Sequence, residues 1–225
     1  MIGEICGPGL TGTAAPEGRR ASIRAIELPA QRWYHPIPGD GSMLDRCTGP
    51  TLDVGAGPGR LTVALAERGV PALAIDITPG AVLLARSSGA LALQRDVFGH
   101  LPATGRWATV LLADGNIGIG GDPLTLLRRA AELVRPGGAV VTETGPPGAP
   151  SRCELARLRT PAGPGPWFPW TLVAADRIRE LGRACGLHVT QAWSDSGRWF
   201  AVLRRGGAAA CAGGQDLEAP ACAEA

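Results

Sequence analysis

The sequence contains no lysine, so all 22 of its basic side chains are arginines. Aromatic residues are also scarce, at 4% of the chain, and no hydrophobic run reaches the roughly 18 residues of a membrane-spanning helix. The formal net charge is only +2, which is too small for the clustered basic face of a nucleic-acid-binding or membrane-surface protein. We therefore expect neither nucleic acid nor membrane as a partner.

The six cysteines are scattered, with no CxxC pair and no histidine at ligand spacing, so the sequence predicts no metal site. The first residues, "MIGEICGPGLTGTAAPEGRR", lack the basic start and apolar stretch of a signal peptide. We expect a cytoplasmic protein, and the sequence leaves open whether it is a monomer or a homodimer.

The length of 225 residues predicts one large domain. Residues 1–30 are rich in glycine, proline and alanine and show no periodicity, so we expect a poorly ordered N-terminal segment. Residues 206–225 have few large apolar groups to bury and are expected to form a disordered tail. The folded domain is then expected over residues 31–205.

Between these ends, strand-like and helix-like runs alternate. Strands are expected at 51–54, 71–76, 90–94, 108–113 and 139–144, and helices at 60–69, 78–89, 122–138 and 171–186. Two further strands at 187–193 and 198–205 are joined by the short turn "SDSG", which predicts an antiparallel pair. The fold class expected is α/β, a doubly wound, mostly parallel seven-stranded sheet with one antiparallel strand.

The stretch "LDVGAGPGR" (52–60) places three glycines at alternate positions directly after the first of these strands. A tight strand–helix turn needs only one glycine, so three of them favour a bound nucleoside. A dinucleotide motif, GxGxxG, would require glycine where Arg60 stands. Asp53 beside the loop disfavours a pyrophosphate and suits a cationic nucleoside.

This stretch resembles the first motif of class I S-adenosylmethionine-dependent methyltransferases. The resemblance extends over about residues 45–205, and through "DGNIGIGGDP" and "GRWFAVL" the chain is similar to a group of actinobacterial methyltransferases. It implies a Rossmann-like fold with S-adenosyl-L-methionine as cofactor, and it places Asp53 near the methionyl ammonium group. The loop that wraps the cofactor would consist of Gly55, Ala56, Gly57 and Gly59.

The resemblance also implies roles for residues after the next two strands. Asp76 would accept hydrogen bonds from both ribose hydroxyls, and Ile77 would pack on the adenine. Asp96 would receive the adenine amino group, and Val97 would offer its backbone N–H. The alternative for Asp76 and Asp96 is that they are solvated loop acids.

Methyl transfer needs mainly an aligned nucleophile, and a general base is optional. Asp114 and Asn116 follow the fourth strand, so they are the candidate catalytic residues that accept a hydrogen bond from an incoming amine or hydroxyl. The alternative is that both simply form turns, which these residue types do well. The segment lacks the "PPY" signature of methyltransferases that modify nucleic-acid amino groups.

Two aromatic segments, "RWYHP" and "GPWFPW", flank the core. They are candidates for a lid over the substrate or for staples that hold loops to the sheet. The candidate substrate residues are Tyr34, His35, Trp167 and Trp170.

The leading hypothesis is methyl transfer to a small-molecule acceptor. Two alternatives remain open: a nicotinamide-dependent reductase, and a catalytically silent S-adenosylmethionine-binding regulator.

Overall fold

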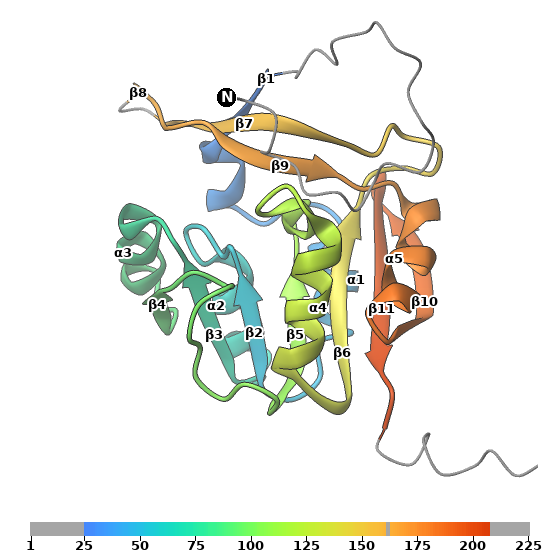
Figure 1. Ribbon diagram of the computed structural model, residues 1–225. Helices are drawn as coiled ribbons and strands as arrows, with labels where there is room; N and C mark the ends of the chain where they lie inside the picture. Colours follow the sequence, from blue (N-terminus) through green and yellow to red (C-terminus); the bar gives the residue numbers. More distant parts are fainter. Residues whose placement is uncertain (1–24, 161–162, 208–225) are drawn as a thin grey trace, which may run out of the picture.

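The computed structural model describes residues 25–160 and 163–207 and contains a central sheet of seven strands (Figure 1). All neighbours pair in parallel except at β11, which is antiparallel to both β6 and β10. In spatial order the strands are β10 (Leu187–Asp195), β11 (Arg198–Arg205), β6 (Val134–Thr144), β5 (Trp107–Leu112), β2 (Thr51–Val54), β3 (Ala72–Asp76) and β4 (Ala92–Gln94). The predicted fold class is confirmed.

Helices cover both faces of this sheet, because the central strands are apolar on both sides. Val110 and Leu112 of β5 pack in one cluster with the front helices, while Leu111 packs on the opposite face (Figure 1). The front helices are α4 (Pro123–Leu133) and α5 (Ile178–Ala184). The other face is covered by α1 (Asp40–Leu44), α2 (Arg60–Glu67) and α3 (Pro79–Ser87). Among the described residues, no helix has the length and hydropathy needed to cross a bilayer.

A second, four-stranded sheet crosses above the carboxyl ends of the parallel strands, and we call it the roof sheet (Figure 1). It consists of β1 (Ala25–Pro29), β7 (Arg152–Thr160), β8 (Gly163–Pro164) and β9 (Phe168–Leu172). The sequence analysis does not predict this sheet, because β1 and β7 pair although about 130 residues separate them in the chain. β1 lies within the segment that was expected to be poorly ordered; residues 1–24 and 208–225 lie outside the described residues.

Two predicted boundaries were wrong. The helix expected over 171–186 begins at Ile178, because the first residues of that run belong to β9 and to the 3-10 helix η4 (Ala175–Arg177). The helix expected to reach residue 138 ends at Leu133, where Val134 takes extended backbone angles and starts β6. Asp122 caps this helix as its position suggests, accepting hydrogen bonds from the N–H groups of Leu124 and Thr125.

Candidate functional site

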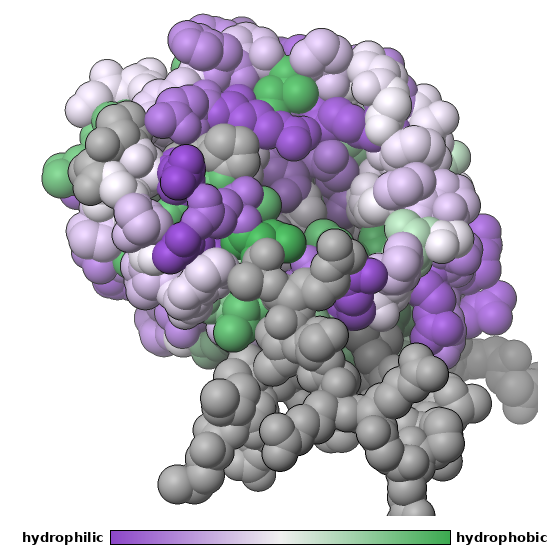
Figure 2. All heavy atoms as spheres, turned by 90° about the horizontal axis from the view of Figure 1, so that it is seen from above, coloured by the Kyte–Doolittle hydropathy of each residue, from purple (hydrophilic) through white to green (hydrophobic). Residues whose placement is uncertain are grey.

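The candidate site lies at the carboxyl ends of β2, β3 and β5, where open parallel sheets bind ligands. The glycine loop follows β2, Asp76 ends β3, and Asp114 follows β5. The roof sheet lies above these ends, and from that side the surface is mostly polar with isolated hydrophobic residues (Figure 2).

The three glycines of the loop all have positive φ, but for different reasons. A Cβ at Gly55 would lie 2.9 Å from the Asn116 amide, and one at Gly59 would lie 2.9 Å from the Ala85 Cβ, so both are required by packing. A Cβ at Gly57 would meet no atom within 4 Å. Gly57 therefore presents bare backbone to open space, as a ligand-wrapping loop requires.

Asp76 connects the loop to β3. Its carboxylate accepts hydrogen bonds from the N–H of Gly57 at 3.0 Å and from the N–H of Thr78 at 2.8 Å. The next side chain, Ile77, is 67% exposed, which is unusual for a large aliphatic group beside a buried strand. The structure therefore brings the predicted ribose and adenine residues to the open side of the loop.

Asp96 and Val97 follow β4. The Asp96 carboxylate is exposed and accepts a hydrogen bond from the N–H of Phe98 at 3.0 Å, while the Val97 side chain is buried. The Phe98 ring lies 3.0 Å from where a Cβ of Gly120 would be, so the loops after β4 and β5 are in contact.

Asp53 does not face this open side. Its carboxylate is 1% exposed and accepts a hydrogen bond from the Thr62 hydroxyl of α2 at 2.7 Å. Burial raises the pKa of Asp53 to about 7, against the opposing effect of the Thr62 hydrogen bond. A contact with a methionyl ammonium group stays a prediction, because the carboxylate lies beneath the loop and points to α2.

Replacing Asp53 by asparagine should make the protein less sensitive to alkaline pH. A raised folded-state pKa means that the native state holds a proton more tightly than the unfolded chain, so stability is lost as pH rises from about 4 to about 7. As pH rises from 5 to 8, wild type should therefore lose on the order of 1–3 kcal/mol of unfolding free energy that Asp53→Asn does not lose. Urea unfolding at both pH values measures this.

The matched control is Asp176→Asn, which changes an exposed carboxylate. It should shift stability equally at both pH values. A wild-type protein that is equally stable at pH 5 and pH 8 would contradict the assignment.

Five charged side chains from different elements meet beside the loop, and we call them the buried ion network: Asp40, Arg60, Asp114, Glu143 and Arg198. Arg60 contacts Asp40 at 2.9 Å and Asp114 at 3.1 Å. Arg198 contacts Asp40 at 2.8 Å, Glu143 at 2.6 Å and Asp114 at 3.3 Å. The network joins α1, α2, the end of β5, β6 and β11, so it fixes the β10–β11 hairpin to the site.

The network holds three carboxylates but only two guanidinium groups. Burial, reinforced by Glu143 and Asp40 and opposed by the two arginines, raises the pKa of Asp114 to about 6. The backbone at Asp114 has a φ of 53°, and its N–H donates to Glu143 at 2.7 Å. A strained backbone and a raised pKa both mark Asp114 as a candidate for function.

Asn116, the second predicted catalytic residue, lies under the glycine loop. Its amide nitrogen donates to the carbonyls of Val54 at 2.7 Å and Gly55 at 3.0 Å, and the side chain is buried. Asn116 thereby ties the 3-10 helix η3 (Asn116–Gly118) to the end of β2. A catalytic role for its remaining oxygen stays a prediction.

Of the predicted substrate residues, the structure brings only Trp170 to Asp114. Its ring lies 3.5 Å from where a Cβ of Gly115 would be. Trp167 is 44% exposed and has the Arg157 guanidinium 4.4 Å from its ring centre. Tyr34 and His35 are exposed at the end of the 3-10 helix η2 (Ala30–Tyr34).

Sequence reasoning missed four residues of the site: Asp40, Arg60 as an ion-pair partner, Glu143 and Arg198. Only Glu143 carried a local signal, as a charge near the end of the apolar run "AVVTET". No group of three or more metal-ligating side chains occurs in the part of the chain that the structure describes.

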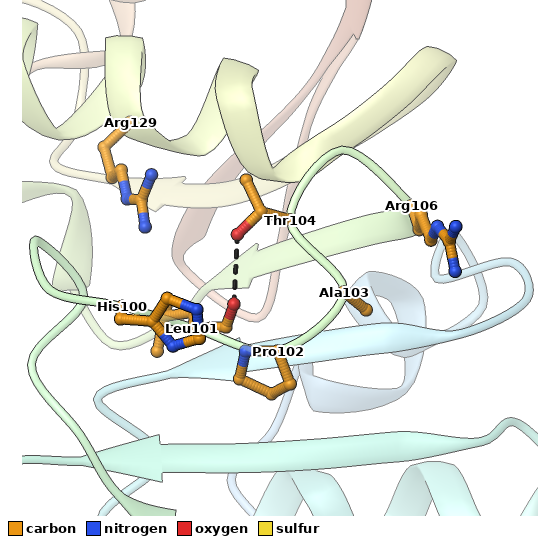
Figure 3. A pocket seen from close by; sticks show the side chains of 7 residues that line it. All are labelled: His100, Leu101, Pro102, Ala103, Thr104, Arg106 and Arg129. Carbon is orange, nitrogen blue, oxygen red and sulfur yellow. Dashed lines mark hydrogen bonds between the residues drawn. The ribbon is translucent and has the colours of Figure 1, made fainter.

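A separate hollow lies near the opposite end of β5, between α4 and the loop of residues 100–106 (Figure 3). Thr104 and Leu101 close this loop by a 3.1 Å hydrogen bond. The Arg129 guanidinium that lines it donates to the carbonyls of Val97 and Gly99 and pairs with Glu132. Its charge is thus used within the protein, and we assign no ligand there.

Residues 51–138, which run from β2 through the glycine loop, Asp76 and Asp114 to the start of β6, match the sequence model of a family described as "Methyltransferase domain". That part of the chain is similar to a methyltransferase domain. No curated protein sequence matches the chain.

Solved structures share the fold of this chain. A methyltransferase from Bacteroides fragilis, solved with S-adenosyl-L-homocysteine, is 21% identical with a TM-score of 0.65, over 80% of this chain and 82% of that one. A 1,6-didemethyltoxoflavin N1-methyltransferase from Burkholderia thailandensis is 19% identical, with a TM-score of 0.58 over 74% and 78%. A glycopeptide N-methyltransferase solved with S-adenosyl-L-methionine is 18% identical, with a TM-score of 0.55 over 75% and 94%.

S-adenosyl-L-methionine is the cofactor that this domain and these neighbours indicate. The residues fit it: Gly57 faces open space, Ile77 offers an exposed apolar surface, and Asp76 stands between them.

Proposed function

We propose that this protein transfers the methyl group of S-adenosyl-L-methionine to a small-molecule acceptor. The observation that carries the proposal is the position of Trp170, whose ring reaches the turn after Asp114 from the roof sheet. A covered site of this kind suits a small molecule better than a long polymer. Two structural neighbours are named for small acceptors, a didemethyltoxoflavin and a glycopeptide.

The bound cofactor supplies an electrophilic methyl group on a sulfonium centre. Gly57, Asp76 and Ile77 would hold the nucleoside, and Asp96 with the Val97 N–H would receive the adenine. Asp114 would take the proton that the acceptor nucleophile loses as its new bond to the methyl carbon forms and the carbon–sulfur bond breaks. A base with a pKa of about 6 is ionised at neutral pH, as this role requires.

The two alternatives make different predictions. A nicotinamide-dependent reductase would need a loop suited to pyrophosphate, whereas Arg60 and Asp114 form an ion pair beside this one. A silent regulator would bind the cofactor but transfer no methyl group to any acceptor. Cytoplasmic location, an actinobacterial grouping and the oligomeric state stay predictions from the sequence.

Isothermal titration calorimetry should show binding of S-adenosyl-L-methionine or S-adenosyl-L-homocysteine and no heat with NADH. Asp76→Ala should weaken this binding by about 1–3 kcal/mol, because hydrogen bonds to a charged group are lost and Gly57 loses its anchor. Asp45→Ala, which removes an exposed carboxylate, is the control and should leave the affinity unchanged.

Binding of NADH without the methyl donor would favour the reductase. Unchanged affinity in Asp76→Ala would place the ribose elsewhere.

A further inference from the structure

The roof sheet contains a buried carboxylate that the proposed methyl transfer does not use. Glu154 of β7 is 1% exposed. Its Oε1 pairs with the Arg152 guanidinium, while its Oε2 is buried and has no hydrogen-bond partner among the described residues. Buried carboxylate oxygens are normally satisfied, so an unpartnered one calls for a donor that is absent from the structure.

The register of the roof sheet places Glu154 beside the candidate site. Glu154 is directly opposite Trp170 in the antiparallel pair of β7 and β9, and directly opposite residues share one face of a sheet. The Trp170 ring on that face lies 3.5 Å from where a Cβ of Gly115 would be, next to Asp114. The face that carries Glu154 is therefore the one turned toward the end of β5.

The same face presents aromatic surface. Phe168 lies two pairs further along, opposite Ala156, and its ring meets Trp170 edge-on at a centroid distance of 5.9 Å. Aromatic rings beside a carboxylate attract an organic cation both through their π-faces and through the charge. The arrangement favours an ammonium group attached to an apolar or aromatic body.

Arg152 does not supply the hydrogen-bond donor that Glu154 Oε2 lacks. It occupies Oε1, and its own side chain is 39% exposed, so much of its charge is solvated. Lys is absent from the sequence, so no lysine ammonium group of this protein can be the donor for Oε2. Among the described residues, none donates to this oxygen.

We propose that Glu154 is a specificity-determining residue that binds a protonated amine of the acceptor, so that the acceptor class is an arylalkylamine. The inference rests on the proposed function, because the acceptor site is defined by the methyl donor. Oε2 is covered in this structure, so the amine reaches it when neighbouring roof side chains such as Trp170 move. The amine held by Glu154 stays protonated, and the methylated atom is a different, uncharged nucleophile near Asp114.

The test measures binding to the full-length protein saturated with S-adenosyl-L-homocysteine. The probes are the amines tryptamine and phenethylamine. Their acidic counterparts are indole-3-propionate and 3-phenylpropionate. Calorimetry measures the affinity of each compound. The amines should bind and the acids should not. Glu154→Gln, which keeps the shape but removes the charge, should weaken amine binding about tenfold or more, the loss expected for a hydrogen bond between charged groups.

Glu27→Gln is the matched control. Glu27 belongs to the same sheet, but it pairs with Arg157 and Arg159 and lies on the opposite face from Glu154. This variant should bind the amines as wild type does, and S-adenosyl-L-homocysteine affinity should be unchanged in both variants. Thermal unfolding reports whether Glu154→Gln remains folded. Its amine affinity is compared with that of wild type at a temperature at which both proteins are folded.

Equal amine affinity in wild type and Glu154→Gln overturns the inference, as does equal binding of amines and acids, or no binding of either amine. In these cases S-adenosyl-L-homocysteine still binds, so the proposed function survives. Failure of S-adenosyl-L-homocysteine to bind wild type would instead overturn the proposed function.

Discussion

Replacement of Arg198 by methionine is expected to lower the free energy of unfolding by about 3–5 kcal/mol at pH 8. Among the described residues Arg198 is the only ion-pair partner of Glu143, and it also binds Asp40 and the carbonyl of Pro38. Without it, three nearly buried carboxylates remain with one guanidinium group, that of Arg60. Removing one partner of a buried pair is costly because the other charge stays desolvated.

The loss should shrink at low pH, because the stranded carboxylates can then be protonated. Urea unfolding at pH 8 and pH 5 measures both values. Arg204→Met is the control: Arg204 lies on the same strand, is exposed and, within the part of the chain that the structure describes, donates only to the carbonyl of Gly137. It should cost less than about 0.5 kcal/mol. Equal losses in the two variants would show that the network contributes no more than a surface arginine.

Replacement of Asp114 by asparagine is expected to lower turnover about 100-fold or more while leaving the protein at least as stable. Turnover falls because the side chain no longer accepts a proton. Stability is kept because the variant balances two carboxylates against two guanidinium groups, and because asparagine tolerates the positive φ of 53° well. A large loss of turnover without a loss of stability separates a catalytic role of Asp114 from a structural one.

The pH profile gives a second readout. The wild-type rate should rise with pH through about 6 as Asp114 loses its proton, and this limb should be absent in Asp114→Asn. Turnover is followed with radiolabelled methyl donor and an acceptor found by the same assay. Asp40→Asn removes the same charge from the network and should reduce turnover far less. Equal effects of the two substitutions would mean that Asp114 acts only through the charge of the network.

The central sheet was predictable because each of its parts is encoded locally. The apolar runs that become β2 and β5 are buried on both faces, and Pro79 and Asp122 mark helix starts by their own backbone chemistry. The glycine loop was predictable for the same reason, because Gly55, Gly57 and Gly59 have positive φ, which glycine adopts more easily than any other residue.

The roof sheet was not predictable in this way. β1 and β7 pair although they are far apart in the chain, and the last two residues of β9, Thr171 and Leu172, fall inside the run that predicts a helix over 171–186. Non-local pairing depends on which segments the fold brings together, and a single sequence carries little local trace of it. Glu154 accordingly had no visible role before the fold was known.

The sequence by itself determined the chain order of the central sheet's strands and of the helices α2 to α5, the side-chain-free loop after β2, and the acids that follow the neighbouring strands. Those features depend on contacts between residues close in the chain. Only the tertiary structure decided that Asp53 faces α2, that five distant charges share one buried network, and that Glu154 lies opposite Trp170, whose ring reaches the turn after β5. The reason is physical: burial and charge pairing depend on the surroundings of a side chain in space, and those surroundings come from segments that are distant in the sequence.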